Sequence, residues 1–143
     1  MSKVRLTDDE MRYISLFEKI TGAVVRDCVI DENYGKIIFV VKNGDMGVAI
    51  GKGGANIERV KRSIEKQAEI IEYSDNPRDF VANAFQPAAV ESVEIKKKKG
   101  KRVALVEVNE KDKGLAIGKD GKNIRKVKKV VQRHYDIDDV ILV

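Results

Sequence analysis

Two short glycine loops contain the residues best suited to hold a ligand. They are Gly51-Lys-Gly-Gly54 and Gly118-Lys-Asp-Gly121. Two glycines that bracket two residues permit a tight turn and let another backbone approach closely. The helix predicted after each loop directs amide N–H groups and a positive dipole end toward the loop, which suits a phosphate. Lys52 and Lys119 add a positive charge. The two loops are therefore predicted to hold a phosphate backbone.

Other kinds of site fit the sequence poorly. An ATP-binding loop needs four residues between its glycines and a hydroxyl residue after its lysine, whereas Gly47 and Gly51 enclose three and no hydroxyl residue follows either lysine. One Cys28 and one His134 cannot assemble a usual zinc site, and nothing positions a nucleophile beside a base. We therefore expect no metal and no cofactor. An enzyme such as a nuclease or an NTPase is the least favoured class.

The loops belong to an internal repeat, which indicates two copies of one structural unit. Residues 47–61 recur as residues 114–128, an offset of 67, and 10 of the 15 aligned pairs are identical. The boundary is predicted near residues 74–76, which gives one domain at 1–74 and a second at 75–143. Because domains of this size have thin cores, we expect the two to pack into one rigid unit with a continuous ligand path.

The flanking segments predict the same order of elements in both copies. In the first copy, Thr7-Asp-Asp-Glu10 is a capping box that begins a helix, and Gly22 is a stop. In the second copy, Asn76 and Pro77 begin the corresponding helix, which Pro87 should end or kink. The apolar patterns predict the other elements: strands at 23–30, 36–42 and 69–73 with helices at 47–50 and 55–68, then strands at 90–96, 102–108 and 139–143 with a helix at 122–134. Each copy therefore reads α-β-β-α-α-β.

Charge is distributed unevenly between the copies. Residues 1–74 hold 12 Lys/Arg and 12 Asp/Glu, whereas residues 75–143 hold 16 and 11, so the second copy carries the whole excess of +5. A basic half favours an anionic partner such as nucleic acid, or an anionic membrane surface. In the helix at 122–134 we expect the apolar residues to face inward and five cations to face outward as an electrostatic footprint. These five are Arg125, Lys126, Lys128, Lys129 and Arg133.

Three further features allow two interpretations each. The lysine-rich segment at 96–102 is either a soluble hairpin tip or a functional basic surface. The tyrosines at positions 34, 73 and 135 could stack on bases, although with so few aromatic residues each is expected to be structural. His134 is expected at the surface or at the end of its helix.

The pattern Ile-Gly-x-x-Gly-x-x-Ile, between two helices, resembles the KH domain, whose GxxG loop clamps about four nucleotides of RNA backbone. The element order is similar to the prokaryotic type II variant. The resemblance implies an α+β fold of two tandem type II KH domains, each a three-stranded sheet covered by helices. It also implies RNA contacts from the loops and their neighbours, which are Ile50, Gly51, Lys52, Gly53, Gly54 and Asn56, and Ile117, Gly118, Lys119, Asp120, Gly121, Lys122, Asn123, Arg125 and Lys126.

The tandem pair and its junction at residues 75–90 resemble the NusA family of transcription termination and antitermination factors. They are most similar to its short archaeal members, which have neither a polymerase-binding domain nor an OB-type domain before the KH pair. The resemblance implies a non-enzymatic protein that binds single-stranded RNA in transcription regulation, with RNA polymerase or a transcription complex as a second partner.

Two alternatives stay open, a ribosome-associated or RNA-processing KH protein and a basic scaffold that binds an acidic protein. The N-terminal stretch at 1–12 lacks the apolar core of a signal peptide, and no apolar run approaches the length of about 20 residues that a bilayer requires. We therefore expect a cytoplasmic monomer that binds no membrane. A single cysteine fits that reducing compartment.

The two loops differ at their third position, where Asp120 replaces Gly53. A carboxylate beside a phosphate is unfavourable by about 1 kcal/mol in partly screened water. We therefore predict that the first loop grips RNA more tightly, while the second relies on the lysines around it.

Overall fold

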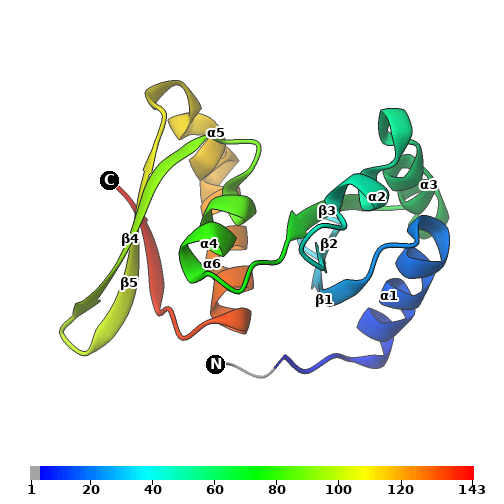
Figure 1. Ribbon diagram of the computed structural model, residues 1–143, viewed down its shortest axis with the longest axis horizontal. Coiled ribbons are helices and arrows are strands. Elements are labelled where there is room, and N and C mark those ends of the chain that lie inside the picture. The colour runs from blue at the N-terminus through cyan, green and yellow to red at the C-terminus, as the bar shows by residue number, and fades with distance from the viewer. Residues whose placement is uncertain (1–3) are drawn as a thin grey trace. The chain divides into compact units, whose positions relative to one another are not determined.

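The computed structural model describes residues 4–143 (Figure 1). The first three residues of the N-terminal stretch, in which we expect no targeting signal, lie outside this range. The chain divides into two compact units, residues 5–74 and residues 75–143. Between residues 4 and 143, no helix combines the length and the apolar character that crossing a bilayer would require.

The first unit has the predicted α-β-β-α-α-β order. Its strands form one sheet in the order β1-β2-β3, with β1 and β2 antiparallel and β2 and β3 parallel. A single 3-10 turn at Lys52–Gly54 separates the second helix from the third. The elements are α1 Asp8–Thr21, β1 Val25–Asp31, β2 Lys36–Val41, α2 Met46–Ile50, α3 Ala55–Ile64 and β3 Gln67–Glu72.

Local signals in the sequence fix the first helix at both ends. The Thr7 hydroxyl accepts a hydrogen bond from the Glu10 amide at 3.1 Å, and the Glu10 carboxylate accepts one from the Thr7 amide at 2.8 Å, so the capping box is confirmed. Gly22 ends the helix with a φ of 80°, a left-handed conformation that glycine adopts at little cost.

The core of the first unit lies between one face of the sheet and the helices that cover it (Figure 1). Phe17 of α1 packs on Phe39 of β2 with ring centroids 4.3 Å apart. Val60 and Ile64 of α3 join this cluster, and Ile57 is partly buried at its edge. Burial of this apolar side holds α3, and with it the loop that precedes α3, in place on the sheet.

The second unit repeats the plan, with strand order β4-β5-β6, β4 and β5 antiparallel, and β5 and β6 parallel. Asn76 caps its first helix through hydrogen bonds from the amides of Arg78 and Asp79. The helix ends at Phe85, and the Gln86–Pro87 peptide bond is cis. The elements are α4 Pro77–Phe85, β4 Val90–Lys98, β5 Lys101–Val108, α5 Lys113–Ile117, α6 Lys122–His134 and β6 Asp139–Leu142.

One expectation about α6 is wrong and another is confirmed only in part, because His134 ends the helix but does not lie at the surface. His134 is buried with 6% of its surface exposed, and its ring lies edge-on to Phe80 with centroids 5.2 Å apart. Lys126, expected to face outward, is only 8% exposed. The next residue, Val127, is also buried, and the stem of a lysine is apolar enough to be buried beside such residues. The buried face of α6 is therefore wider than the spacing of its apolar residues indicates.

Two boundaries also differ from the prediction. The helix expected at 55–68 ends at Ile64, because Glu65 adopts a left-handed conformation with φ 56° and ψ 36°. The chain then enters β3 at Gln67, earlier than expected. In the second unit, the strands continue into the lysine-rich segment, and only Lys99 and Gly100 separate β4 from β5. All of these lysines except Lys99 are thus strand residues and not part of a loose loop.

Candidate nucleic-acid interface

The two glycine loops have nearly the same backbone conformation. The first glycines, Gly51 and Gly118, have φ and ψ of 77° and 169°, and of 78° and 166°. The last glycines, Gly54 and Gly121, are left-handed at 79° and 13°, and at 74° and 14°. Each loop thus connects a five-residue helix to a long helix by the same turn. The repeat in the sequence is a repeat in geometry.

The first glycine of each loop is required by close packing. A Cβ at Gly51 would lie 2.7 Å from Cγ and 2.8 Å from the amide nitrogen of Asn56, and one at Gly118 would lie 2.6 Å from the amide nitrogen of Asn123. The asparagines also brace the loops, because Asn56 Nδ2 donates to the Val48 carbonyl and Asn123 Nδ2 to the Ala116 carbonyl, both at 2.8 Å. This bracing is a structural role that the sequence does not indicate. RNA contact by the two asparagines stays a prediction.

The third position is where the loops differ. Gly53 and Asp120 are both left-handed, with φ of 61° and 56°, and a Cβ at Gly53 would meet no atom within 4 Å. The second loop has an additional brace, since Arg125 Nη1 donates to the Asp120 carbonyl at 2.6 Å. Glu58 occupies the equivalent position in the first unit. The backbone at this position therefore accommodates an aspartate, and the Arg125 guanidinium holds the Asp120 carbonyl in place.

Each loop places a cation beside exposed apolar side chains. Lys52 and Lys119 are exposed at the loop tips. In the short helices before the loops, Ile50 and Ile117 are 40% and 43% exposed, and the residues two positions earlier are more so, with Val48 at 48% and Leu115 at 50%. Ile57 and Ile124, after the loops, are partly buried.

Sequence reasoning missed Val48 and Leu115. A usable signal existed, since a helix of five residues cannot bury apolar side chains on every side, and both copies keep an apolar residue at this position. In each unit, the charged loop tip thus lies next to two exposed apolar side chains, and the first turn of a long helix follows the loop. We call each pair of apolar side chains the apolar ledge: Val48 and Ile50 in the first unit, and Leu115 and Ile117 in the second. Such a site can hold an anionic chain that also carries flat apolar groups.

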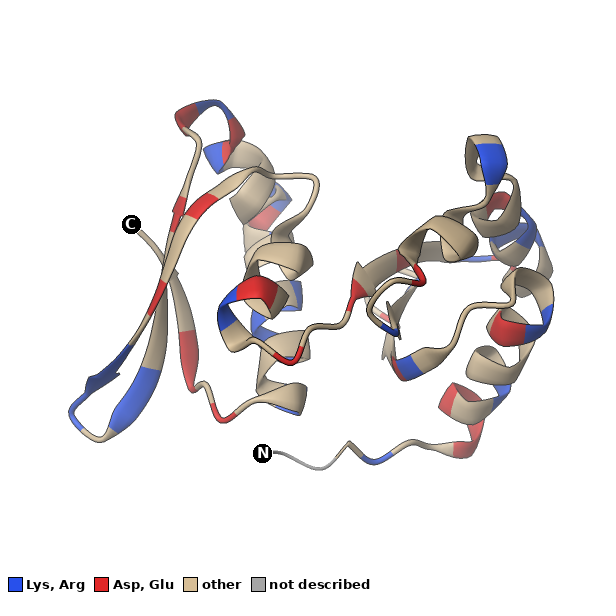
Figure 2. Ribbon diagram, viewed as in Figure 1, with Lys and Arg blue, Asp and Glu red and all other residues tan. Residues whose placement is uncertain are grey.

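The surroundings of the loops differ in charge (Figure 2). Helix α3 carries three cations and one acid, whereas α6 carries six cations and no acid over Lys122–His134. Of the predicted contact residues of α6, Arg125 is exposed, while Lys122 and Asn123 are half-buried and Lys126 is buried. Of the five cations expected to face outward from α6, two are exposed, two are half-buried and Lys126 is buried, and their role as an electrostatic footprint stays a prediction.

Family models match both units. A model described as "KH domain" matches residues 11–75, and one described as "NusA-like second KH domain" matches residues 77–142. The two matches cover the two units found in the structure and divide the chain at the junction that precedes α4.

Curated proteins and a solved structure match almost the whole chain. The chain is 39% identical over 140 residues to the "Probable transcription termination protein NusA" of Halococcus morrhuae, covering 98% of this chain and 99% of that protein. The protein of the same name in Methanocaldococcus jannaschii is also 39% identical, with 98% and 75% covered. The crystal structure of APE1850 superposes with a TM-score of 0.84 at 36% identity, covering 96% of this chain and 100% of that one.

A bacterial protein matches over a shorter range. The "Transcription termination/antitermination protein NusA" of Mycobacterium bovis is 37% identical over 92 residues, which is 64% of this chain and 26% of that protein. The similarity to the archaeal proteins extends over the two units together, and the predicted resemblance is confirmed, including the α+β fold of two tandem KH domains.

Proposed function

Because the chain belongs to the NusA-like family of tandem KH proteins, we propose that it binds single-stranded RNA through its two GxxG loops and acts in the regulation of transcription termination and antitermination. The observation that carries the proposal is the loop itself, built twice with matching φ and ψ angles. KH domains bind RNA by clamping about four nucleotides of backbone on such a loop.

The geometry of the first unit supports one role for the glycine loop and another for the apolar ledge beside it. Phosphates of the strand lie over the loop, where the first turn of α3 supplies N–H groups and Lys52 supplies a charge. Bases lie on the apolar ledge of Val48 and Ile50, which are exposed and adjacent to the loop. The second unit does the same with Lys119 and the ledge of Leu115 and Ile117.

The role in transcription is proposed from the relatives, which are named transcription termination proteins. RNA polymerase or a transcription complex is then the second partner, and the chain acts as a monomer. Pull-down of the tagged chain against purified RNA polymerase and against ribosomes separates this role from ribosome-associated or RNA-processing work. Recovery of ribosomes without polymerase would contradict the proposal for transcription and leave RNA binding intact.

The RNA-binding role is tested by reversing the charge of the first loop. The variant K52D/G53D should weaken single-stranded RNA binding at least ~10-fold, a loss of ~1.4 kcal/mol, in anisotropy titrations. The fold should survive, because Gly53 has open space for a Cβ and the second unit already carries an aspartate at the equivalent left-handed position. G53D alone is the matched control for the added side chain. Unchanged affinity in the folded double variant would contradict the role of the loop.

A further inference from the structure

A strongly basic surface lies on the second unit, away from its glycine loop. Six of the seven residues from 96 to 102 are Lys or Arg, and all six are exposed. We call these six residues the hairpin patch: Lys96, Lys97, Lys98, Lys99, Lys101 and Arg102. Figure 2 shows the cations gathered at the tip of the β4–β5 hairpin.

The register of the hairpin places like charges directly opposite each other. Lys98 pairs with Lys101 and Lys97 pairs with Arg102 across the antiparallel strands. Like charges in directly opposed cross-strand positions destabilise a sheet. Two such pairs in succession are therefore unfavourable for the folded hairpin unless an anion lies between or over them.

The turn adds a second unfavourable feature. Lys99 and Gly100 connect the strands with φ of 50° and 81°, both left-handed. Two-residue turns of this kind favour asparagine or aspartate before the glycine, because these residues tolerate the left-handed region. A lysine at this position keeps the charge at the tip at the expense of the preferred backbone conformation.

Protection of a sheet edge does not explain the whole patch. Lysines on an edge strand prevent edge-to-edge pairing, and β4 is an edge strand of its sheet. Lys101 and Arg102, however, belong to the central strand β5, just before the residues that pair with β6. The edge strand β1 of the first unit has no lysine, and its hairpin turn carries Asp31 and Glu32 in place of cations.

The acids near the patch do not neutralise it. Glu94 lies 3.5 Å from Lys96, and the Asp138 carboxylate accepts the Arg102 backbone amide at 2.9 Å. The Asp139 carboxylate accepts a hydrogen bond from Lys128 Nζ at 2.9 Å, and the charge of Lys101 also helps to lower its pKa. Asp139 therefore connects the hairpin to α6, where the exposed Lys129 continues the positive surface.

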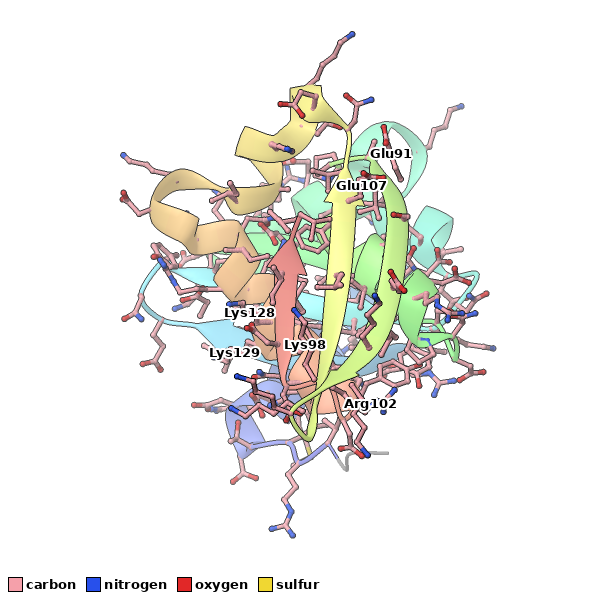
Figure 3. The ribbon with its side chains drawn as sticks, turned by 90° about the vertical axis from the view of Figure 1, so that its left-hand side faces the viewer. Glu91, Lys98, Arg102, Glu107, Lys128 and Lys129 are labelled. Carbon is pink, nitrogen blue, oxygen red and sulfur yellow. The ribbon has the colours of Figure 1, made fainter. Side chains whose placement is uncertain are left out.

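Charge is segregated along the sheet. Figure 3 shows Glu91 and Glu107 toward one end of the sheet and Lys98 and Arg102 toward the other, with Lys128 and Lys129 on α6. The glycine loop precedes the N-terminus of α6, and Lys128 lies roughly 9 Å farther along the helix axis than Lys122. A strand held at the loop must therefore extend beyond its clamped nucleotides to reach the patch.

We propose that the hairpin patch is a second, sequence-independent binding site for the phosphate backbone of RNA, engaged only by strands longer than the glycine loops hold. The inference rests on the proposed function. Closely spaced phosphates match the closely spaced ammonium groups, and each neutralised phosphate releases counterions. The face of the sheet that the helices cover contributes less to this proposed phosphate binding. There, Arg102 and Arg78 line a hollow together with Asp75, whose carboxylate repels phosphate.

The test compares two lengths of single-stranded RNA on the full chain. A strand of about 6 nucleotides exceeds the footprint of one loop, and a strand of about 24 extends well beyond both. The variant K97Q/K98Q/K101Q removes a partner from each opposed pair. Its matched control, R5Q/R62Q/K66Q, removes three exposed cations from the first unit.

The hairpin variant should lose at least ~10-fold in affinity for the long RNA and less than ~2-fold for the short one, and its log–log salt slope should fall by about 2. Its thermal midpoint should not fall, because repulsion has been removed. The control should change both affinities little.

Each other outcome overturns the inference. Equal losses in the two variants would show a net-charge effect. An equal loss on both RNA lengths would show that the variant acts through the loops. Unchanged binding of the long RNA would show that the patch is not an RNA site, and an acidic protein would then be the candidate partner. If the unaltered chain bound neither RNA, the proposed function would fail together with this inference, a result distinct from failure of the variant alone.

Discussion

The two units share a loop and differ in almost everything that surrounds it. Their loops agree closely in φ and ψ, and both place an exposed lysine beside an apolar ledge. Residues 1–74 are electrically neutral and include an acidic hairpin turn, whereas residues 75–143 carry the whole net charge and include a basic hairpin. The two copies thus share the geometry of the loops, where we propose that an RNA backbone is held, and differ in the charge of the surrounding surface.

This comparison separates two ways to bind one ligand. A loop that presents amides at fixed positions depends on exact backbone angles and tolerates few substitutions. A charged surface acts through the summed field of its side chains and depends on salt. Under the proposed function, we expect the first unit to rely mainly on loop geometry and the second to add an electrostatic field to a loop in which Asp120 repels phosphate.

The largest effect is expected from Gly51→Ala. The new Cβ would lie within 3 Å of three Asn56 atoms, at a φ of 77° and ψ of 169° that side chains rarely adopt. We expect a loss of about 3 kcal/mol in the free energy of unfolding of the first unit. Gly53→Ala is the control and should cost about 1 kcal/mol, because its Cβ meets open space. Urea denaturation measures both, and equal losses would contradict the close-packing argument.

A smaller effect, on RNA affinity, is expected when the charge of Lys119 in the second loop is reversed. K119D creates the same loop sequence in the second unit that K52D/G53D creates in the first. We expect a loss of only about 3-fold in affinity for single-stranded RNA, about 0.7 kcal/mol, because six cations of α6 remain. The loss should shrink as salt is raised, because salt screens the charge at position 119 together with the field of α6. A loss as large as that of the first-loop variant, at every salt concentration, would remove the distinction between the units.

Removal of the Asp120 carboxylate should have a moderate effect of the opposite sign. Asp120→Asn keeps the size of the side chain and a residue that tolerates the left-handed region. The hydrogen bond from Arg125 goes to the backbone carbonyl, so it should persist. RNA affinity should rise up to about 5-fold, about 1 kcal/mol, at low salt. Asp120→Gly should give the same gain, and unchanged affinity in both variants would contradict the proposed repulsion.

The smallest effect concerns the ion pair between α6 and β6. The hydrogen bond from Lys128 holds the pKa of the Asp139 carboxyl below its ordinary value. A depressed pKa contributes stability above the unfolded-state pKa of about 3.9, and this contribution is lost as pH falls through the lower value in the folded state. Lys128→Met should therefore lower stability at pH 7 by a few tenths of a kcal/mol, as for other half-exposed pairs. The difference from the unaltered chain should begin to shrink as pH falls below about 4 and should vanish below the folded-state pKa of Asp139, and a difference that persists there would contradict the assignment.

Much of this arrangement could be predicted from the sequence because its signals are local. The repeat is visible in the residues themselves. Each helix signal depends only on a few neighbouring residues, as do the capping box at Thr7, the stop at Gly22 and the break before Pro87. Features decided by tertiary contacts could not be predicted. His134 is buried against Phe80 of α4, Lys126 is buried although it is charged, and Glu65 ends α3 in a left-handed conformation without a glycine signal.

The candidate site shows the same division. The loops were found from glycine spacing, but their internal braces from Asn56, Asn123 and Arg125 were not, since each depends on how a turn folds back on its own helix. The apolar ledges were found only in part. Ile50 and Ile117 stand in the loop motif, whereas Val48 and Leu115 became visible once the short helices were oriented.

The central claim is that two loops of one geometry hold the RNA backbone, and the variant K52D/G53D/K119D tests it most directly. Anisotropy titration with a single strand of about 24 nucleotides should show at least ~30-fold weaker binding than the unaltered chain, the product of the two separate losses for independent sites. Circular dichroism should show an unchanged fold. A correctly folded variant with the affinity of the unaltered chain would contradict the account.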